Sequence, residues 1–469
     1  MKTRLTILAA LCLTVFLAAV SPVSAEESST GISVDGNIEA RNQSGVHHGE
    51  VYRNYLKADL NFGKNFGNTV VKVTLRAEDD TIRPEDNDTD TQHLNEKDYL
   101  RSDETGPRRA YLREAYISHD IYFDSIIDSI NLKMGRIIYT WGNSDEVKPV
   151  DIINPQDYSN LYFTLIQERK YGVFSGSMSI FFTENFFLEG VVIPEFRPSE
   201  IASNVFVQRE IREASAAGST INNPNEPDAE NQENSYAGRL GLTLFDIDMH
   251  INYYYGYDHL PAYEMEVVTL FPAITTAITP VYRQVQMVGF DFQRALFLGI
   301  SIRGEGAYYE RGKYFKYSNE SPGGNPLLSP SPLAIDLSAG GNGSVEKDYI
   351  EYTVGFDDND FIFDDLYVNV QYHQQIILDY EEGLEKEQYV NMILWNVRYY
   401  MFNKKFCIST RGAYDTGDKS VYGNAEIMVK LADNFEFMVG GWMVEGRRDT
   451  LIGQFDYYDM VYVAGRLTF

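Results

Sequence analysis

A polar segment from Gly135 to Tyr158 combines two basic residues, four acidic residues and a tryptophan within 24 positions. Trp141-Gly142 interrupts an alternating pattern that ends near Tyr139, and Asn154-Pro155 is a turn signal. We expect Arg136 to pair with Asp145, Asp151 or Asp157. The segment predicts either a constriction with ligand contacts or an ordered loop that caps the fold. Its candidate residues are Arg136, Trp141, Asp145, Asp151, Asn154 and Asp157.

Further charged side chains recur at alternate positions of apolar runs elsewhere in the chain. In each run the charged residues share one side and the apolar residues share the other. Opposed arginines and carboxylates on one face would set a transverse electric field, or they would simply neutralise and brace one another. The candidates chosen from these rows are Arg239, Arg303, Glu305, Arg398 and Arg411.

Catalysis by a nucleophile and a base would require a suitably placed histidine. His119 lies between Ser118 and Asp120, but neighbours along a strand point to opposite faces, so this trio cannot converge. His250 and His373 share the parity of the charged rows and have no partner that the sequence identifies. No nucleophile elbow or zinc motif is present, so we predict no enzymatic activity.

The acidic stretch Asp86-x-Asp88-x-Asp90 resembles the opening of a calcium-binding loop. Thr91 stands where that loop needs glycine, and Lys97 stands where a bidentate glutamate should close the site. We therefore reject an EF-hand and predict a solvated acidic loop, with loose calcium binding as the alternative. No bound metal or cofactor is predicted.

The elements that position these residues are strands with a period of two. Leu56, Ala58 and Leu60 alternate with polar residues, and the pattern returns around 71–77, 247–255, 300–308, 366–372 and 423–431. Such strands have one apolar and one polar face. With 34 Tyr and 27 Phe but only 3 Trp, the composition also favours many short strands over helices.

The connections between the strands alternate between short and long. Short ones include Gly63–Gly67, Phe245–Asp246 and Asn403–Lys405; the long polar segments are 79–107, 197–235, 258–280, 311–347, 374–388 and 445–455. This rhythm is typical of membrane β-barrels with short periplasmic turns and long outer loops, and it argues against a soluble β-sandwich or propeller. We predict an all-β, antiparallel up-and-down transmembrane barrel of about 18 strands, with 16 as the alternative.

The two ends of the chain fit this interpretation. Lys2 and Arg4 precede an apolar run that ends in small residues, which predicts a signal peptide over 1–25, cleaved after Ala25, and a barrel over 26–469. The terminal Phe469 shares a face with Leu467 and Val463, as expected of a last strand that barrel-insertion machinery recognises. Loss of the leader would change the net charge from −28 to −30, which excludes nucleic acid and favours cations or neutral solutes.

One stretch resembles a known family. Gly135-Arg136 followed by Trp141-Gly142 and by Asp151-Ile152-Ile153-Asn154-Pro155-Gln156-Asp157 is similar to an uncharacterised family of proteobacterial outer-membrane barrels, classed as a domain of unknown function. Leu112–Tyr116 and Gly304–Tyr308 are similar to other segments of that family. The resemblance implies a porin-like channel for hydrophobic or lipid-like molecules that works beside an envelope exporter.

The sequence thus predicts a porin-like channel of the Gram-negative outer membrane that lets small or amphipathic solutes pass without energy input. Its expected surroundings are outer-membrane lipid and lipopolysaccharide. Two alternatives stay open: an adhesin, receptor or structural barrel with a closed lumen, and a membrane-embedded lipid hydrolase.

Overall fold

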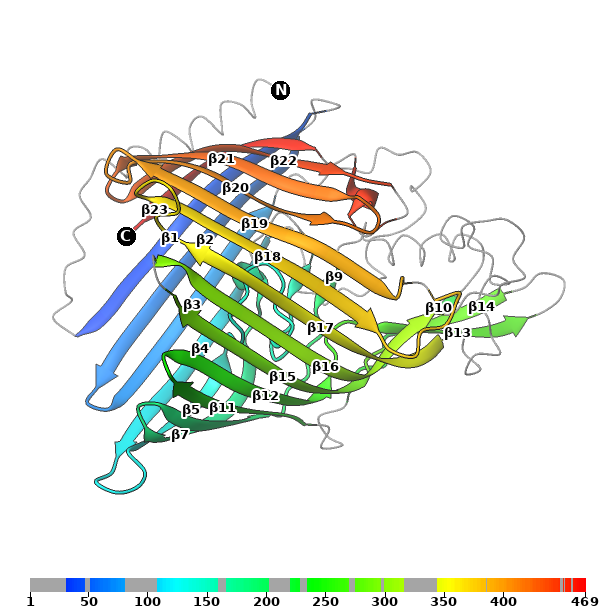
Figure 1. The fold of residues 1–469 in the computed structure, drawn as a ribbon, viewed down its shortest axis with the longest axis horizontal. Helices are drawn as coiled ribbons and strands as arrows, with labels where there is room; N and C mark the ends of the chain where they lie inside the picture. The colour runs from blue at the N-terminus through cyan, green and yellow to red at the C-terminus, as the bar shows by residue number, and fades with distance from the viewer. Residues whose placement is uncertain are drawn as a thin grey trace.

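Eighteen antiparallel strands form one closed sheet in the computed structural model (Figure 1), counted over the residues that it describes. Each strand pairs with the next one along the chain, and the pairing of β23 with β1 closes the ring. The predicted 18-stranded up-and-down barrel is therefore confirmed. The described residues are 31–46, 51–80, 108–158, 166–201, 220–227, 234–269, 275–296, 299–315, 344–384, 386–447, 450, 452–456 and 459–469.

The barrel strands have the following bounds. The first half contains β1 (Ile32–Gly45), β2 (Val51–Phe66), β3 (Thr69–Asp80), β4 (Arg108–Tyr122), β5 (Ser129–Ile137), β7 (Val173–Thr183), β8 (Phe186–Ile193), β11 (Ser235–Leu244) and β12 (Ile247–Tyr257). The second half contains β15 (Gln284–Ala295), β16 (Ser301–Phe315), β17 (Ser344–Asp358), β18 (Leu366–Ile377), β19 (Tyr389–Met401), β20 (Phe406–Asp415), β21 (Val421–Ala432), β22 (Phe435–Glu445) and β23 (Met460–Thr468).

The alternation of side chains assigns the two faces of the wall as the sequence predicts. Arg76 is only 3 % exposed, whereas its neighbour Leu75 is 42 % exposed on the outer face. Lys57 is also buried inside, and Ile251 is exposed outside. A charge on the outer face would cost about 2–4 kcal/mol near the middle of a bilayer, which explains why the charges point inward. The wall is that of an outer-membrane β-barrel.

The connections follow the predicted rhythm of short and long. Phe245 and Asp246 both have positive φ (54° and 60°) and join β11 to β12, as a two-residue turn with right-handed strand twist requires. The beginning of β1 and the end of β23 lie at the same end of the barrel as these short turns. The pairing of β23 with β1 closes the ladder, so the wall leaves no open sheet edge in lipid.

The predicted outer loop 258–280 proves to contain a β-hairpin. Its strands β13 (Ala262–Thr269) and β14 (Thr275–Val281) pair antiparallel, and β10 (Thr220–Ile221) adds in parallel. This small sheet extends past the end of the barrel wall (Figure 1). The segment is a long connection outside the wall, as predicted, and the hairpin within it keeps the strand period without being part of the barrel. A two-stranded sheet pairs β6 (Asp157–Tyr158) with β9 (Glu200–Ile201).

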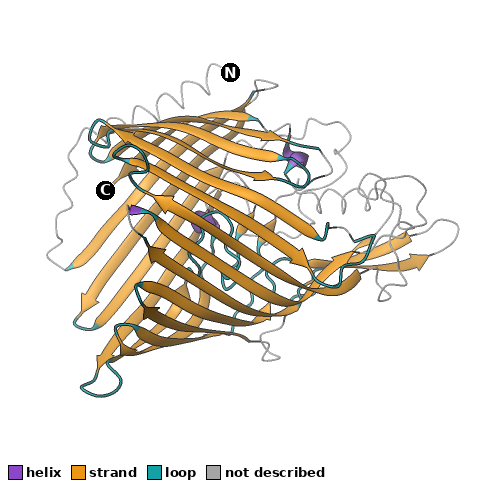
Figure 2. Ribbon diagram, in the orientation of Figure 1, coloured by secondary structure: helices purple, strands orange, loops and turns teal. Residues whose placement is uncertain are grey.

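One long connection folds inward. Its described residues, 138–158 and 166–172, are called the lumenal loop below; they lie between β5 and β7 and occupy the space inside the ring of strands (Figure 2). They include the short helix α2 (Ile166–Arg169); a 3₁₀ helix, η5 (Gly453–Phe455), lies between β22 and β23. No helix in the described ranges is both long and apolar enough to cross a membrane.

Candidate functional site

The lumenal loop crosses from β5 to strands on the far side of the barrel. The amide of Asn143 donates to the carboxylate of Asp291 (2.9 Å), and Arg303 donates to the carbonyl of Asn143 (2.9 Å). The backbone amides of Ser144 and Asp145 donate to Glu305 and Gln371 (both 3.3 Å). These contacts come from β15, β16 and β18, so the charged rows of the wall hold the loop in place.

Asn154 joins the beginning and the end of the lumenal loop. Its Oδ1 accepts from the backbone N–H of Tyr139 (2.7 Å), while its Nδ2 donates to the carbonyls of Ile137 (3.0 Å) and Tyr171 (2.8 Å). The side chain is buried, so each of these groups depends on it for a partner. The turn signal in the sequence thus marks the residue that closes the loop.

A buried ion pair lies beside this clamp. Lys170 pairs with Asp151, and its Nζ also donates to the carbonyl of Tyr139 at 2.8 Å. Burial lowers the pKa of Lys170, although Asp151 acts in the opposite direction. Removing either partner would leave a buried charge without its counterion, which is the costly way to break such a pair.

The same half of the barrel is filled by apolar side chains. Trp141, Val150 and Ile153 from the loop pack with inward residues of the wall such as Met287, all in one buried cluster. The hydroxyl of Tyr309 donates to the carbonyl of Pro149 at 2.5 Å. This apolar packing holds the loop against the side of the wall that runs from β5 to β16.

Helix α2 reaches toward β2, β3 and β4. Lys57 donates to the carboxylate of Glu168 (2.8 Å), and Arg76 donates to the carbonyl of the same residue (3.1 Å). Burial raises the pKa of the Glu168 carboxyl, but the interaction with the Lys57 ammonium outweighs burial. The pKa of Glu168 therefore lies below its ordinary value of 4.5. Arg113 adds a hydrogen bond to the carbonyl of Gln167 (2.7 Å). The loop is thus anchored on both sides of the lumen.

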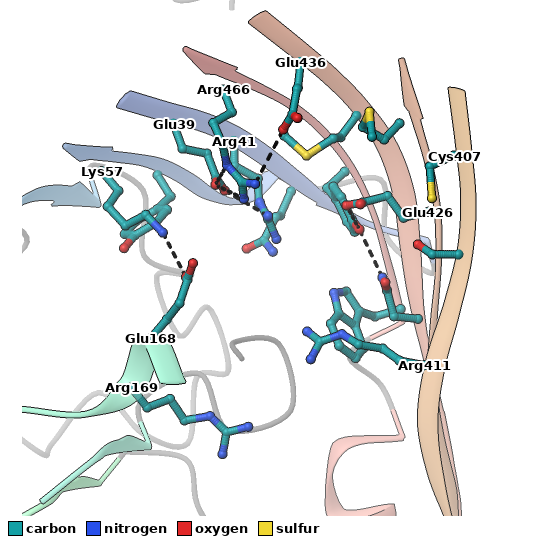
Figure 3. Close-up of a pocket in the computed structure, with 18 of the residues that line it drawn as sticks. Glu39, Arg41, Lys57, Glu168, Arg169, Cys407, Arg411, Glu426, Glu436 and Arg466 are labelled. Carbon is teal, nitrogen blue, oxygen red and sulfur yellow. Dashed lines mark hydrogen bonds and ion pairs between the residues drawn. The ribbon is translucent and has the colours of Figure 1, made fainter. Parts of the chain in front are cut away.

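A polar cavity of about 380 Å³ lies between the lumenal loop and the wall formed by β1–β4 and β19–β23. At roughly 30 Å³ per molecule, this volume corresponds to about a dozen waters or one small organic solute. Figure 3 shows charged side chains entering it from both the strands and α2. Among the described residues that line it, eight are basic and six are acidic. We call it the lumenal cavity.

On one side of the lumenal cavity the charges are paired closely. Glu39 accepts from Arg466 (2.8 Å) and lies 2.8 Å from Arg41. Arg109 contacts Asp157 (2.5 Å) and also pairs with Glu78. These ion pairs join β1 to β23, and β4 to β3 and to the lumenal loop, and so brace the wall.

On the other side, arginines meet aromatic rings. The guanidinium of Arg398 lies 4.5 Å from the ring centre of Tyr367, and that of Arg411 lies 4.9 Å from the ring centre of Trp442. Arg411 also lies 3.3 Å from Glu146 of the lumenal loop. Arg169 of α2 points toward Arg411 from across the cavity (Figure 3).

The structure separates the predicted site residues into three groups. Asp157, Arg398 and Arg411 line the lumenal cavity. The second group belongs to the loop or to the wall residues near it: Trp141, Asp145, Asp151, Asn154, Arg239, Arg303 and Glu305. Arg136 pairs with Glu195 (2.9 Å) and the carbonyl of Gly172 (2.8 Å), not with the aspartates expected of it. Lys170 and Arg109 take Asp151 and Asp157 instead.

Several cavity residues were not singled out from the sequence. Glu39 and Arg41 lie at polar positions of an alternating strand, so parity alone could have included them. Glu168 and Arg169 follow no strand pattern, and only the folding of the loop into the lumen brings them to the cavity. Arg109 lies at the beginning of β4, next to a stretch predicted as a solvated loop.

The two lumenal histidines are not alone, which corrects the prediction. His250 Nδ1 lies 2.8 Å from Asp291. His373 lies 3.1 Å from the hydroxyl of Thr353 and 3.5 Å from Glu351, an arrangement with the composition of a catalytic trio. Cross-strand pairing of β17 with β18 brings them together, which sequence parity could not show. Thr353 is only 1 % exposed, so a substrate cannot reach its hydroxyl in this conformation.

Other predicted features lie outside the described residues. These are the cleavage position Ala25 and the acidic stretch Asp86–Asp90. Within the part of the chain that the structure describes, no cluster of three or more His, Cys, Asp or Glu side chains is arranged to hold a metal ion.

Most of the chain matches the model of a known protein family. The family model described as "Protein of unknown function (DUF1302)" matches residues 9–391. The chain belongs to the DUF1302 family. This agrees with the resemblance of the Gly135–Asp157 segment. No curated protein matches this DUF1302 chain.

Solved structures similar to this DUF1302 barrel include outer-membrane proteins. The outer membrane channel DcaP of Acinetobacter baumannii is 9 % identical, with a TM-score of 0.42, over 95 % of this chain and 100 % of that one. OpdK of Pseudomonas aeruginosa, solved with vanillate, is 6 % identical with a TM-score of 0.48, over 94 % and 99 %. OccAB2 of A. baumannii is 10 % identical with a TM-score of 0.47, over 94 % and 98 %. Similarity at this level assigns no solute to the DUF1302 chain.

Proposed function

We propose that this protein is an outer-membrane channel through which small or amphipathic solutes diffuse passively. The observation that carries the proposal is the lumenal loop, which fills one half of the barrel with apolar packing and leaves a charged cavity beside the opposite wall. A barrel of about 18 strands is wide enough to leave an aqueous lumen, and an inward-folded loop would narrow it to a selective passage.

The chemistry of the cavity also supports transport over catalysis. Its polar groups are tied in ion pairs on one side, as between Glu39 and Arg466, and arginines lie against aromatic rings on the other. Such a surface hydrates and guides a solute without binding it tightly, and a solute must be able to leave a channel as easily as it enters. The buried trio of Thr353, His373 and Glu351 lies outside the set of residues that line this cavity.

Reconstitution of the purified barrel into planar lipid bilayers tests the proposal. We expect discrete current steps that scale with voltage, and uptake of small solutes by proteoliposomes. Protein that inserts and stays folded but carries no current would contradict the proposal and favour a receptor or structural barrel with a closed lumen. Ester hydrolysis that disappears in His373→Ala would favour the lipid hydrolase instead.

A further inference from the structure

The charge of the lumenal cavity differs from that of the chain. The whole chain has a net charge of −28, which led us to expect cations or neutral solutes. Among the described residues that line the cavity, however, basic side chains outnumber acidic ones by eight to six. A solute responds to the charges within about one Debye length, roughly 8–10 Å, so the arrangement of charges around the cavity matters more than the total.

Three arginines lie on the side of the cavity where arginines meet aromatic rings. Arg398 and Arg411 come from neighbouring strands: Arg411 is opposite Asn396, and Arg398 lies two positions further along the same face. Side chains so placed start about 7–8 Å apart, which long arginines can bridge. Arg169 of α2 faces Arg411 from across the cavity (Figure 3). We call Arg169, Arg398 and Arg411 the arginine cluster.

The carboxylates that line the cavity have partners other than Arg398. Glu39 is shared by Arg41 and Arg466, Glu168 is bound by Lys57, and Glu78 and Asp157 are bound by Arg109. Glu436 lies 3.7 Å from Arg466, and Glu426 accepts a hydrogen bond from the hydroxyl of Tyr462 (2.7 Å). Arg411 has Glu146 at 3.3 Å. For Arg398, no carboxylate among the described residues lies within ion-pair distance, and its Nε is buried without a hydrogen-bond partner.

Apolar groups lie beside the cluster on the cavity wall. Trp442, Met428 and Met438 line the same cavity from β21 and β22. A guanidinium that stacks on an aromatic ring keeps its N–H groups free for an anion. The combination suits a solute with a negatively charged end and an apolar body, which the arginines would hold by charge-assisted hydrogen bonds.

We propose that the arginine cluster is a binding subsite for small organic anions, specifically carboxylates with an apolar body. The inference rests on the proposed channel function and names its substrate class. Arg398 is the decisive residue because, among the described residues, its removal leaves no carboxylate unpaired and breaks no hydrogen bond or ion pair of the lumenal loop.

The experiment uses hexanoate as the probe and hexylammonium as a cation of matched length. In bilayers we expect the wild-type channel to prefer chloride over potassium and to be blocked by hexanoate, not by hexylammonium. Arg398→Gln should lower the anion preference and the hexanoate affinity by about two- to fivefold. Arg398→Lys should restore most of the anion preference, while Arg294→Gln, an exposed position on β15, should change neither.

Calorimetric titration of hexanoate into detergent-solubilised protein separates this inference from the channel proposal. Saturable binding that weakens in Arg398→Gln, in a protein that carries no current, would support the subsite and contradict the channel. Current without anion preference, and without hexanoate binding, would leave the channel standing and overturn the subsite. Equal hexanoate affinity in the wild type and Arg398→Gln would also overturn it.

Discussion

Replacing Asn154 with alanine should release the lumenal loop while the barrel stays intact. The side chain makes three hydrogen bonds, to the N–H of Tyr139 and to the carbonyls of Ile137 and Tyr171. Each net bond is worth about 1 kcal/mol, and leaving buried backbone groups without partners adds to the loss, so we expect about 3–6 kcal/mol. The eighteen-stranded ladder contains none of these bonds, so the loss falls on the loop alone.

Because the lumenal loop fills half of the barrel, its release should widen the passage. We expect Asn154→Ala to show a larger and noisier single-channel current than the wild type, and trypsin to cut at Lys170, which is buried in the intact loop. Asn185→Ala, in the exposed turn between β7 and β8, is the matched control and should behave as the wild type. An Asn154→Ala channel with wild-type current and full protease resistance would refute the reasoning.

Three further predictions concern the lipid face of the wall, a buried ion pair of the wall, and the ion pair that holds α2. Ile251→Lys places a charge on the lipid face of β12 at a cost of about 2–4 kcal/mol, so the folded fraction in lipid vesicles should fall. Arg76→Gln leaves the buried Asp59 without its counterion, and the urea midpoint should fall by an amount that corresponds to about 3–5 kcal/mol. The pKa of Glu168 lies below 4.5, so its bond to Lys57 should persist from pH 7 to pH 5 and weaken only below 4.5, where current noise should increase.

Each of these has an outcome that contradicts it. Normal vesicle insertion of Ile251→Lys would mean that this face of β12 does not contact lipid. An unchanged urea midpoint in Arg76→Gln would mean that the pair with Asp59 carries little stability. Current noise that rises already between pH 7 and pH 5, in the wild type and equally in Lys57→Gln, would assign the pH response to groups other than Glu168.

The barrel could be predicted from the sequence because its strands obey a purely local rule. Alternation placed Arg76 and Arg398 inside and Leu75 outside, and the lengths of the connections set the direction of each strand. The hairpin of β13 and β14 shows the limit, since a strand outside the membrane has the same local pattern as one in the wall.

The site was harder to predict because it depends on contacts between distant parts of the chain. Trp141 and Asn154 marked the correct segment, but nothing local reveals that Arg303 and Glu305 hold its backbone, or that α2 brings Arg169 to face Arg411. The ion-pair partners of the charged residues could not be predicted from the sequence either. Arg136 has three aspartates nearby in the sequence, but it pairs with Glu195.

The most direct test of a passage along β20 uses a single cysteine in a Cys407→Ser background. Ser409 lines the lumenal cavity, whereas its neighbour Ile408 is exposed on the outer face. A charged, membrane-impermeant thiol reagent should lower the current of Ser409→Cys channels in discrete steps and leave Ile408→Cys channels unchanged. If the reagent leaves the Ser409→Cys current intact, or blocks only the Ile408→Cys channel, solutes do not pass through this cavity.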